Sequence, residues 1–213
     1  MTSSFKRYKY FVFAIGMMWF FQGNAQGDPS TFKGQIALGV NSPSQSGFVD
    51  DFEAKSVNFP SINLGVQYMF NSLLGTKLDF GYNRFSNLDN TPEFKVNYTR
   101  LNAQLVCNVT RVLGFVPQRI GVFAHAGPGF SMIKPLVDYG ENDTSFLNAM
   151  GGLECHFGVS DALSVYLDAS YILGLGDDFD PVTTGYGSFN GNLLTFTVGF
   201  SISLSGCYYC EHE

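Results

Sequence analysis

The sequence predicts an all-β protein, an eight-stranded antiparallel up-and-down transmembrane β-barrel. Three observations lead to this fold class. Eight segments alternate apolar and polar residues with the two-residue period of a strand. The connections between these segments alternate between long and short. Charged residues make up only 14% of the 213 residues, far below the roughly 25% that is usual in soluble domains.

The eight predicted strands follow one another along most of the chain. Residues 194–204 show the pattern clearly, because Leu194, Phe196 and Val198 alternate with threonines. Successive side chains of a strand point to opposite faces of the sheet, so each segment has one apolar and one polar face. The predicted strands are residues 32–40, 61–70, 76–85, 96–109, 120–132, 147–157, 163–173 and 194–204.

The lengths of the connections predict the order of the strands. The connections after the first, third, fifth and seventh strands are long, and the other three are shorter. The long ones are residues 41–58, 86–95, 133–145 and 174–191, and the shorter ones are 71–75, 110–119 and 158–162. Long loops at one end and short turns at the other are typical of an up-and-down membrane barrel, with both termini on the short-turn side.

Alternation alone leaves open which face lies inside. A soluble eight-stranded barrel would turn its apolar face inward and bind an apolar ligand there. Here the polar face is rich in glycine, which suits a narrow interior, and the apolar face carries the phenylalanines, tyrosines and leucines expected of a wall in lipid. In hydrocarbon the sheet must close, because an open edge would leave backbone groups unpaired.

The first 25 residues are predicted to be a signal peptide. Lys6, Arg7 and Lys9 precede the apolar stretch 10–21, and cleavage is expected after Ala25. The remaining chain divides into a barrel, 26–205, and a short periplasmic tail, 206–213. It has nine basic and eighteen acidic residues, a net charge of about −9, which argues against a nucleic-acid partner. No later segment has 18 consecutive apolar residues, so no transmembrane helix is expected.

Four segments resemble a known family. Residues 65–85, 98–115, 121–133 and 189–204 resemble the N-terminal barrel of OmpA-like proteins from Bacteroidota-type bacteria. The resemblance implies an integral protein of the outer membrane in the porin family. Only nine residues follow Leu204 in this sequence, so the peptidoglycan-binding domain that is usual in the family is not expected.

The last predicted strand also resembles the assembly signal that the barrel-assembly machinery reads. The matching residues are Thr197, Gly199, Ile202 and Leu204. The resemblance therefore implies that this machinery is a partner during biogenesis.

The polar face holds a set of ionisable residues, which we expect to form a polar network inside the barrel. Buried charges persist only when they are paired, so this network should plug and stiffen the lumen. A narrow, gated ion path is the alternative. The residues are Lys33, Lys77, Asp79, Arg100, His125, Glu154, His156 and Asp168.

No catalytic site is expected. Some outer-membrane barrels modify lipids with a histidine, a serine and an acid, and His125, Ser131, Glu154 and His156 are the available pieces. Alternation points all four inward, away from lipid, and no nucleophile motif surrounds a serine.

The four cysteines fall into two groups. Cys207 and Cys210, with His212 close by, are one ligand short of a closed zinc site, so a local disulfide or free thiols are expected in an oxidising periplasm. Cys107 and Cys155 should point outward and behave as small apolar residues.

Two long connections are rich in acidic residues, which could hold calcium but lack the spacing of a known calcium loop, so a solvated rim is expected. They are Asp138, Glu141 and Asp143 in one and Asp177, Asp178 and Asp180 in the other. The sequence therefore predicts no metal and no cofactor.

The predicted function is structural or surface-interacting and non-enzymatic. The alternatives are a small gated pore or transport protein and, less favoured, a lipid-modifying enzyme. The expected partners are outer-membrane lipids and the assembly machinery, and the protein is expected to be a monomer in the bacterial outer membrane. The sequence identifies no surface ligand.

Overall fold

The computed structural model describes residues 32–44, 53–113, 116–117, 119–136, 143–175 and 191–205. These residues form eight strands and one short helix. The strands are β1 (Phe32–Pro43), β2 (Asn58–Met69), β3 (Leu74–Ser86), β4 (Lys95–Asn108), β5 (Ile120–Leu136), β6 (Thr144–Gly158), β7 (Leu163–Gly174) and β8 (Leu193–Ser203). The helix, α2, spans Thr110–Leu113 between β4 and β5.

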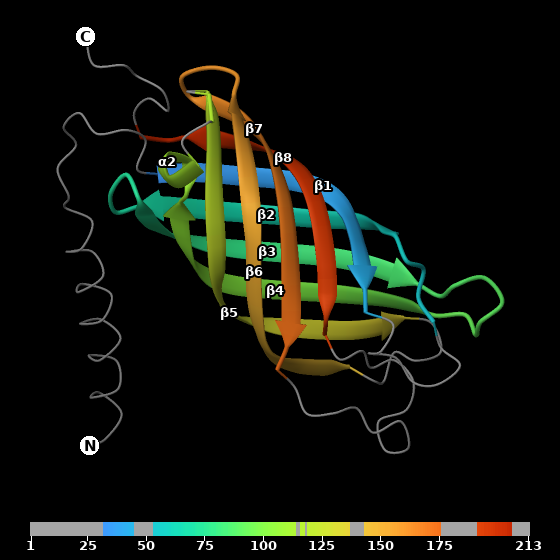
Figure 1. Cartoon of the computed structure of the whole chain (residues 1–213). Helices are drawn as coiled ribbons and strands as arrows, with labels where there is room; N and C mark the ends of the chain where they lie inside the picture. The colour runs from blue at the N-terminus through green and yellow to red at the C-terminus, as the bar shows by residue number, and fades with distance from the viewer. Residues whose placement is uncertain are drawn as a thin grey trace, which may run out of the picture.

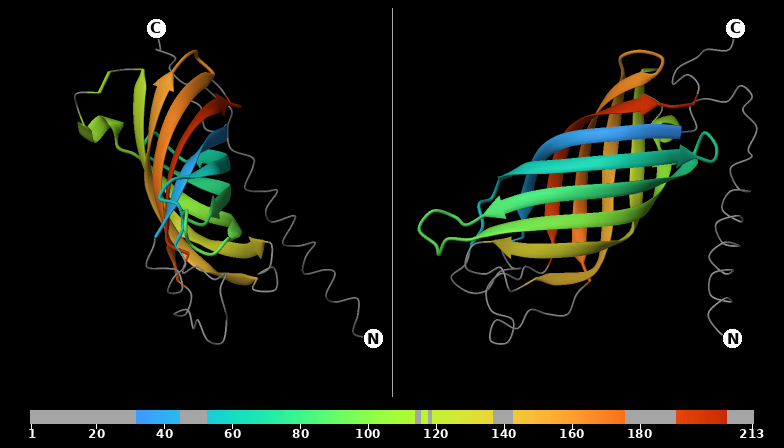
Figure 2. Two further views of the ribbon diagram at one scale, coloured as in Figure 1. Left: turned by 90° about the vertical axis from the view of Figure 1, so that its right-hand side faces the viewer. Right: turned by 180° about the vertical axis from the view of Figure 1, so that it is seen from behind.

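The eight strands form one closed antiparallel barrel (Figure 1). Each strand pairs with the next along the chain, and β8 closes the barrel by pairing with β1 from Lys33↔Ser203 to Pro43↔Leu193. Figure 2 shows the strands wrapping around the interior at a tilt, as closure of a barrel requires. The predicted fold class and the predicted meander are confirmed.

The connections differ in length, but one departs from the predicted alternation: the β4–β5 connection, 109–119, was expected to be short and has eleven residues, because it contains the helix α2, against eight in 87–94 and seven in 137–143. The β2–β3 and β6–β7 turns have only four residues each, 70–73 and 159–162. The strands extend further toward the long-loop end than predicted, since β5 runs to Leu136 and β6 begins at Thr144. Near these ends Ile133 of β5 and Phe146 of β6 pack in one apolar cluster, and this contact is not visible in local alternation. The predicted signal peptide and tail lie outside the described residues.

The short helix α2 was not predicted. The side-chain oxygen of Asn108 accepts a hydrogen bond from the Thr110 amide at 3.1 Å, and the Thr110 hydroxyl accepts one from the Val122 amide at 2.7 Å. These two bonds fix a single turn of helix, which is too short to produce a periodic signal in the sequence.

The outer face of the barrel carries the apolar side chains. Along the described strands, Leu38, Leu78, Leu105, Val198 and their neighbours are about half exposed. A barrel in water would bury side chains of this kind, so a wall of them around the whole circumference indicates a lipid environment. Among the described residues, no helix is both long and apolar enough to cross a bilayer.

Candidate functional site

The interior of the barrel is the candidate site, and it holds all eight of the ionisable residues that the alternation places there. Each of them is buried, with at most 5% of its surface exposed. They are Lys33, Lys77, Asp79, Arg100, His125, Glu154, His156 and Asp168. Their contacts form three groups.

The first group centres on Glu154 of β6. Lys77 reaches from β3 on the opposite side of the lumen and donates from Nζ to Glu154 Oε1 at 2.5 Å. Two further contacts reach Oε2, from His156 Nε2 at 2.8 Å and from Gln35 Nε2 at 3.1 Å. The carboxylate therefore links three parts of the barrel wall: β1, β3 and β6.

Aromatic side chains hold His156 in place. Its ring stacks on Tyr166, with centroids 5.0 Å apart and planes 13° apart, and meets Phe123 edge-on at 5.1 Å. Its Nδ1 lies 3.2 Å from the Ser164 hydroxyl. The Lys33 ammonium lies over the Phe123 ring, 5.0 Å from its centroid, and makes a cation–π contact with it.

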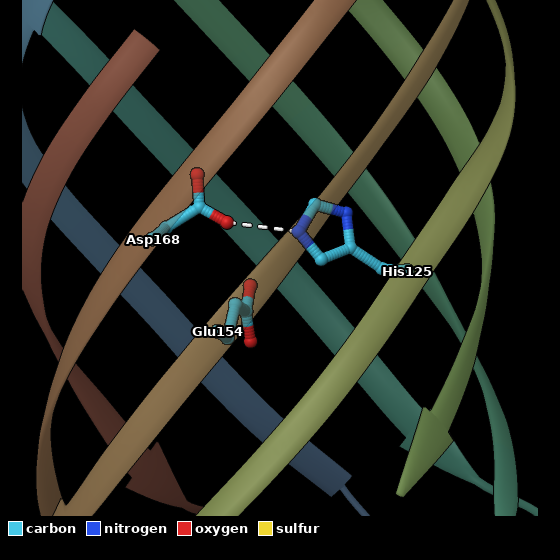
Figure 3. Close-up of side chains that lie close together, drawn as sticks. All are labelled: His125, Glu154 and Asp168. Carbon is cyan, nitrogen blue, oxygen red and sulfur yellow. Dashed lines mark hydrogen bonds and ion pairs between the residues drawn. The ribbon is translucent and has the colours of Figure 1, made fainter. Parts of the chain in front are cut away.

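The second group contains His125 and Asp168. His125 Nε2 lies 2.8 Å from Asp168 Oδ2, and the Ser170 hydroxyl donates to Asp168 Oδ1 at 2.7 Å. On the other side of the ring, Nδ1 lies 2.5 Å from Gln104 Oε1. His125 is on β5 and Asp168 on β7, so this contact passes over β6 (Figure 3).

A glycine makes that crossing possible. Gly152 of β6 pairs with His125 on one side and with Ser170 on the other. A Cβ at this position would lie 2.8 Å from His125 Cε1 and would also collide with the Ser170 hydroxyl. The absence of a side chain at 152 therefore lets the imidazole lie across β6 and reach the carboxylate on β7.

The third group contains Arg100 and Asp79. The guanidinium forms an ion pair with Asp79. It also donates to Asn63 at 3.0 Å and to Asn102 at 3.2 Å. It lies over Gly81, where a Cβ would be 2.6 Å from the guanidinium carbon. This ion pair is thus anchored to three consecutive strands, β2, β3 and β4.

The charges of the lumen balance among the described residues. Lys33, Lys77 and Arg100 face three carboxylates, those of Asp79, Glu154 and Asp168, and the two histidines complete the set. Burying these groups is costly unless each has an opposite charge or a hydrogen-bond partner within reach. The observed pairing meets that requirement, which favours a stiff network over an open, hydrated path.

Apolar side chains fill the lumen on both sides of this polar layer. At the short-turn end Met69, Val106 and Phe123 form a buried cluster. At the long-loop end a larger buried cluster includes two residues from the loops, Ala54 and Phe94. Its members are Ala54, Phe85, Phe94, Val96, Tyr98, Ile133, Met150, Ile172 and Leu193.

The sequence reasoning did not identify these two clusters. Their strand members lie at inward positions of the alternating pattern, so the alternation could have predicted that they face the lumen. Tyr98 is two residues before Arg100, and Phe123 is two residues before His125. The loop residue Phe94 carries no such signal, because only the fold shows that it turns into the mouth of the barrel.

Of the suggested catalytic pieces, His156 contacts Glu154 and His125 lies near Glu154, but Ser131 is elsewhere in the lumen. Ser131 is bound to Tyr98 and Asn148, both at 2.7 Å. A different serine, Ser164, lies beside His156, whose other nitrogen contacts Glu154, so the three form a chain of serine, histidine and acid. Ser164 and His156 are 0% exposed and Glu154 1%, so these three side chains lie fully inside the barrel.

The residues of the assembly-signal resemblance lie on both faces of β8. Thr197 is buried in the lumen, whereas Ile202 and Leu204 are about half exposed on the outer face. Gly199 also faces inward, under the ring of Tyr166.

The structure places two of the four cysteines. Cys107 and Cys155 are free and half-buried. The tail residues Cys207 and Cys210 lie outside the described residues, as do the acidic loop residues except Asp143.

Comparison with known proteins supports the fold. No sequence-family model matches the chain, and no curated protein matches it. Neisserial surface protein A aligns with a TM-score of 0.54 and 12% identity over 81% of this chain and 96% of that one. The outer membrane protein OprG from Pseudomonas aeruginosa aligns with a TM-score of 0.56 and 11% identity, over 84% and 98%.

The comparisons thus agree with the OmpA-like barrel that the sequence resembles, at the level of the fold. The chain has the fold of the small eight-stranded outer-membrane β-barrels.

Proposed function

We propose that this protein is a closed, non-enzymatic scaffold of the bacterial outer membrane that presents its long connections at the cell surface. The observation that carries the proposal is the filled lumen, in which a charge-balanced polar layer lies between two buried apolar clusters. An eight-stranded barrel is only wide enough to hold its own side chains. Such an interior supports rigidity rather than conduction.

The alternative functions fit the lumen less well. A pore needs a hydrated path, but the side chains of Phe123, Tyr98 and Met150 are at most 4% exposed within the lumen. A lipid-modifying enzyme needs a nucleophile that lipid can reach, and Ser164 is 0% exposed. The exposed side chains in the middle of the wall, such as Leu78, Leu105 and Leu167, are apolar.

The remaining parts of the proposal concern biogenesis and assembly. Export by a cleaved signal peptide and insertion by the barrel-assembly machinery would bring the chain to the outer membrane, where it acts as a monomer. A single barrel already pairs every strand with two neighbours, so no strand edge is left for a second copy.

Conductance in planar bilayers tests the proposal. The refolded protein should give no steady channel current. A matched variant shortens the polar layer by Lys77→Ser, Arg100→Ser and Glu154→Ser and the two apolar clusters by Tyr98→Ala and Phe123→Ala, and it should raise the leak. A steady current through the unmodified barrel would refute the closed scaffold and favour the pore.

A second experiment separates a structural role from a surface contact. Deleting the gene should make cells more sensitive to detergent. A barrel in which residues 88–92 of the β3–β4 connection, 87–94, are replaced by Asn-Gly keeps all eight strands and should restore resistance. If the full-length protein restores resistance to detergent and the shortened barrel does not, the function lies in the surface loop instead.

A further inference from the structure

We propose that His125, Glu154 and Asp168 form a buried binding site for one divalent transition-metal ion of the zinc class. The three residues come from three consecutive strands, β5, β6 and β7, and their side chains converge in the lumen (Figure 3). One ligand atom from each residue lies within 4.8 Å of the other two. Imidazole nitrogen and carboxylate oxygen are both ordinary zinc ligands.

The distances suit a metal ion. Zinc binds nitrogen and oxygen ligands at about 2.0–2.2 Å, so two adjacent ligand atoms around one ion lie roughly 3 Å apart. His125 Nε2 and Asp168 Oδ2 are 2.8 Å apart. Glu154 contributes the third ligand from the strand between them, and a small rotation of its side chain would bring its oxygen to the same centre.

Each ligand is also held by a neighbour, as ligands in metal sites usually are. Gln104 Oε1 lies 2.5 Å from His125 Nδ1, so it can accept the proton there and leave Nε2 free to bind a metal. The Ser170 hydroxyl holds Asp168 through its other oxygen. Lys77 and His156 hold Glu154.

The electrostatics give the site a reason to bind a cation. Two carboxylates lie close together in an interior where charge is poorly screened. His125 faces carboxylate or amide oxygens at both of its nitrogens, so each position requires a proton, or at Nε2 a metal ion, in between. An ion at Nε2 would replace a proton between His125 and Asp168, whose contacts are to His125 and Ser170, whereas Glu154 also has Lys77 as a partner.

Access determines when the ion would enter. The apolar clusters close both ends of the lumen, so the ion should enter while the barrel is folding and be retained afterwards. The experiment therefore supplies the metal during refolding.

The test measures zinc in the refolded mature chain, in a Cys207→Ser, Cys210→Ser background that removes the thiols of the tail. After refolding with Zn²⁺ and gel filtration, elemental analysis should find one zinc per barrel. His125→Gln and Asp168→Asn should retain less than a tenth of that amount. Asp79→Asn removes a buried carboxylate outside the site and is the matched control, with zinc unchanged.

Two further measurements keep the proposal testable if a variant does not fold. Gln104→Leu leaves all three ligands in place and should weaken zinc retention about 10–100-fold. X-ray absorption of the zinc-loaded unmodified barrel should show one imidazole nitrogen and oxygen ligands. A sulfur shell, full retention by His125→Gln, or no zinc after refolding in its presence would each refute the site.

Discussion

At the scale of single residues, small side chains decide how the lumen is filled. Gly199 of β8 lies under the ring of Tyr166, and a Cβ there would be 2.8 Å from Tyr166 Cε1 and 2.6 Å from the Cβ of Ala37. Gly81 and Gly152 give room in the same way to Arg100 and His125. The large polar side chains can cross the interior because the glycines beneath them have no side chain that would occupy the same space.

The first prediction concerns Gly199. Gly199→Ala should destabilise the barrel by about 1–3 kcal/mol, because the added methyl group overlaps β1 and the Tyr166 ring. Gly34→Ala is the matched control: its Cβ would meet only Leu204 Cδ1 at 3.8 Å, an ordinary contact, so its effect should stay within about 0.5 kcal/mol. Urea titration in lipid vesicles measures both, and equal costs would contradict the close approach at 199.

The residue scale also shows what the sequence can and cannot predict about the site. Alternation places Lys77, Glu154 and Asp168 on the inner face. It does not show that Lys77 spans the lumen to Glu154 while His125 passes over Gly152 to Asp168. Those contacts depend on the register between strands and on the barrel's width, and neither is recorded in the spacing of residues along one strand.

At the scale of strands, the predicted pattern is most informative. All eight strands are confirmed, because a strand with one lipid face and one lumen face must alternate throughout its length. The ends of β5 and β6 and the helix α2 were missed. They depend on contacts with other parts of the chain and on a single capping residue, Asn108, rather than on periodicity.

A prediction for the strands uses the depth of the bilayer. Leu167 and Val198 are partners on β7 and β8, and both are about half exposed on the outer wall. Replacing either by arginine places a charge in hydrocarbon and should cost roughly 2–4 kcal/mol, whereas Leu204→Arg, beyond the end of β8, should cost about 0–1 kcal/mol. Folding titrations in lipid compare the three, and uniform costs would contradict the lipid-facing wall.

A second prediction for the strands concerns the thiols. Cys107 is on β4 and Cys155 on β6, with β5 between them, so their backbones lie about 9–10 Å apart by the usual strand spacing. A disulfide needs Cα atoms within roughly 7 Å. Mass mapping of unreduced protein should find both thiols free and at most one bond, Cys207–Cys210. A bond between 107 and 155 in folded protein would contradict the strand order.

At the scale of the whole molecule, the closed sheet determines where the polar side chains and the connections between strands lie. Closure pairs β1 with β8, and this leaves no edge in lipid and forces every polar side chain of the inner face into one narrow interior. The two sets of connections, turns and loops, lie at opposite ends of the barrel (Figure 1). The barrel therefore has only two possible orientations across the membrane, and one experiment can distinguish them.

The last prediction concerns that orientation. Outer-membrane barrels have short turns in the periplasm and longer loops outside the cell, so the β3–β4 connection should be extracellular and the β6–β7 turn periplasmic. Asn90 and Ser160 are exposed positions in these two connections, and Asn90 adopts a positive φ of 73°, a turn conformation that marks a loop tip. An epitope inserted after Asn90 should be labelled on intact cells, and one after Ser160 only after the outer membrane is permeabilised. The permeabilised sample controls for expression, since both epitopes should then react equally. Labelling of intact cells at 160 alone would invert the orientation and place the long loops, and the surface contact proposed for them, in the periplasm.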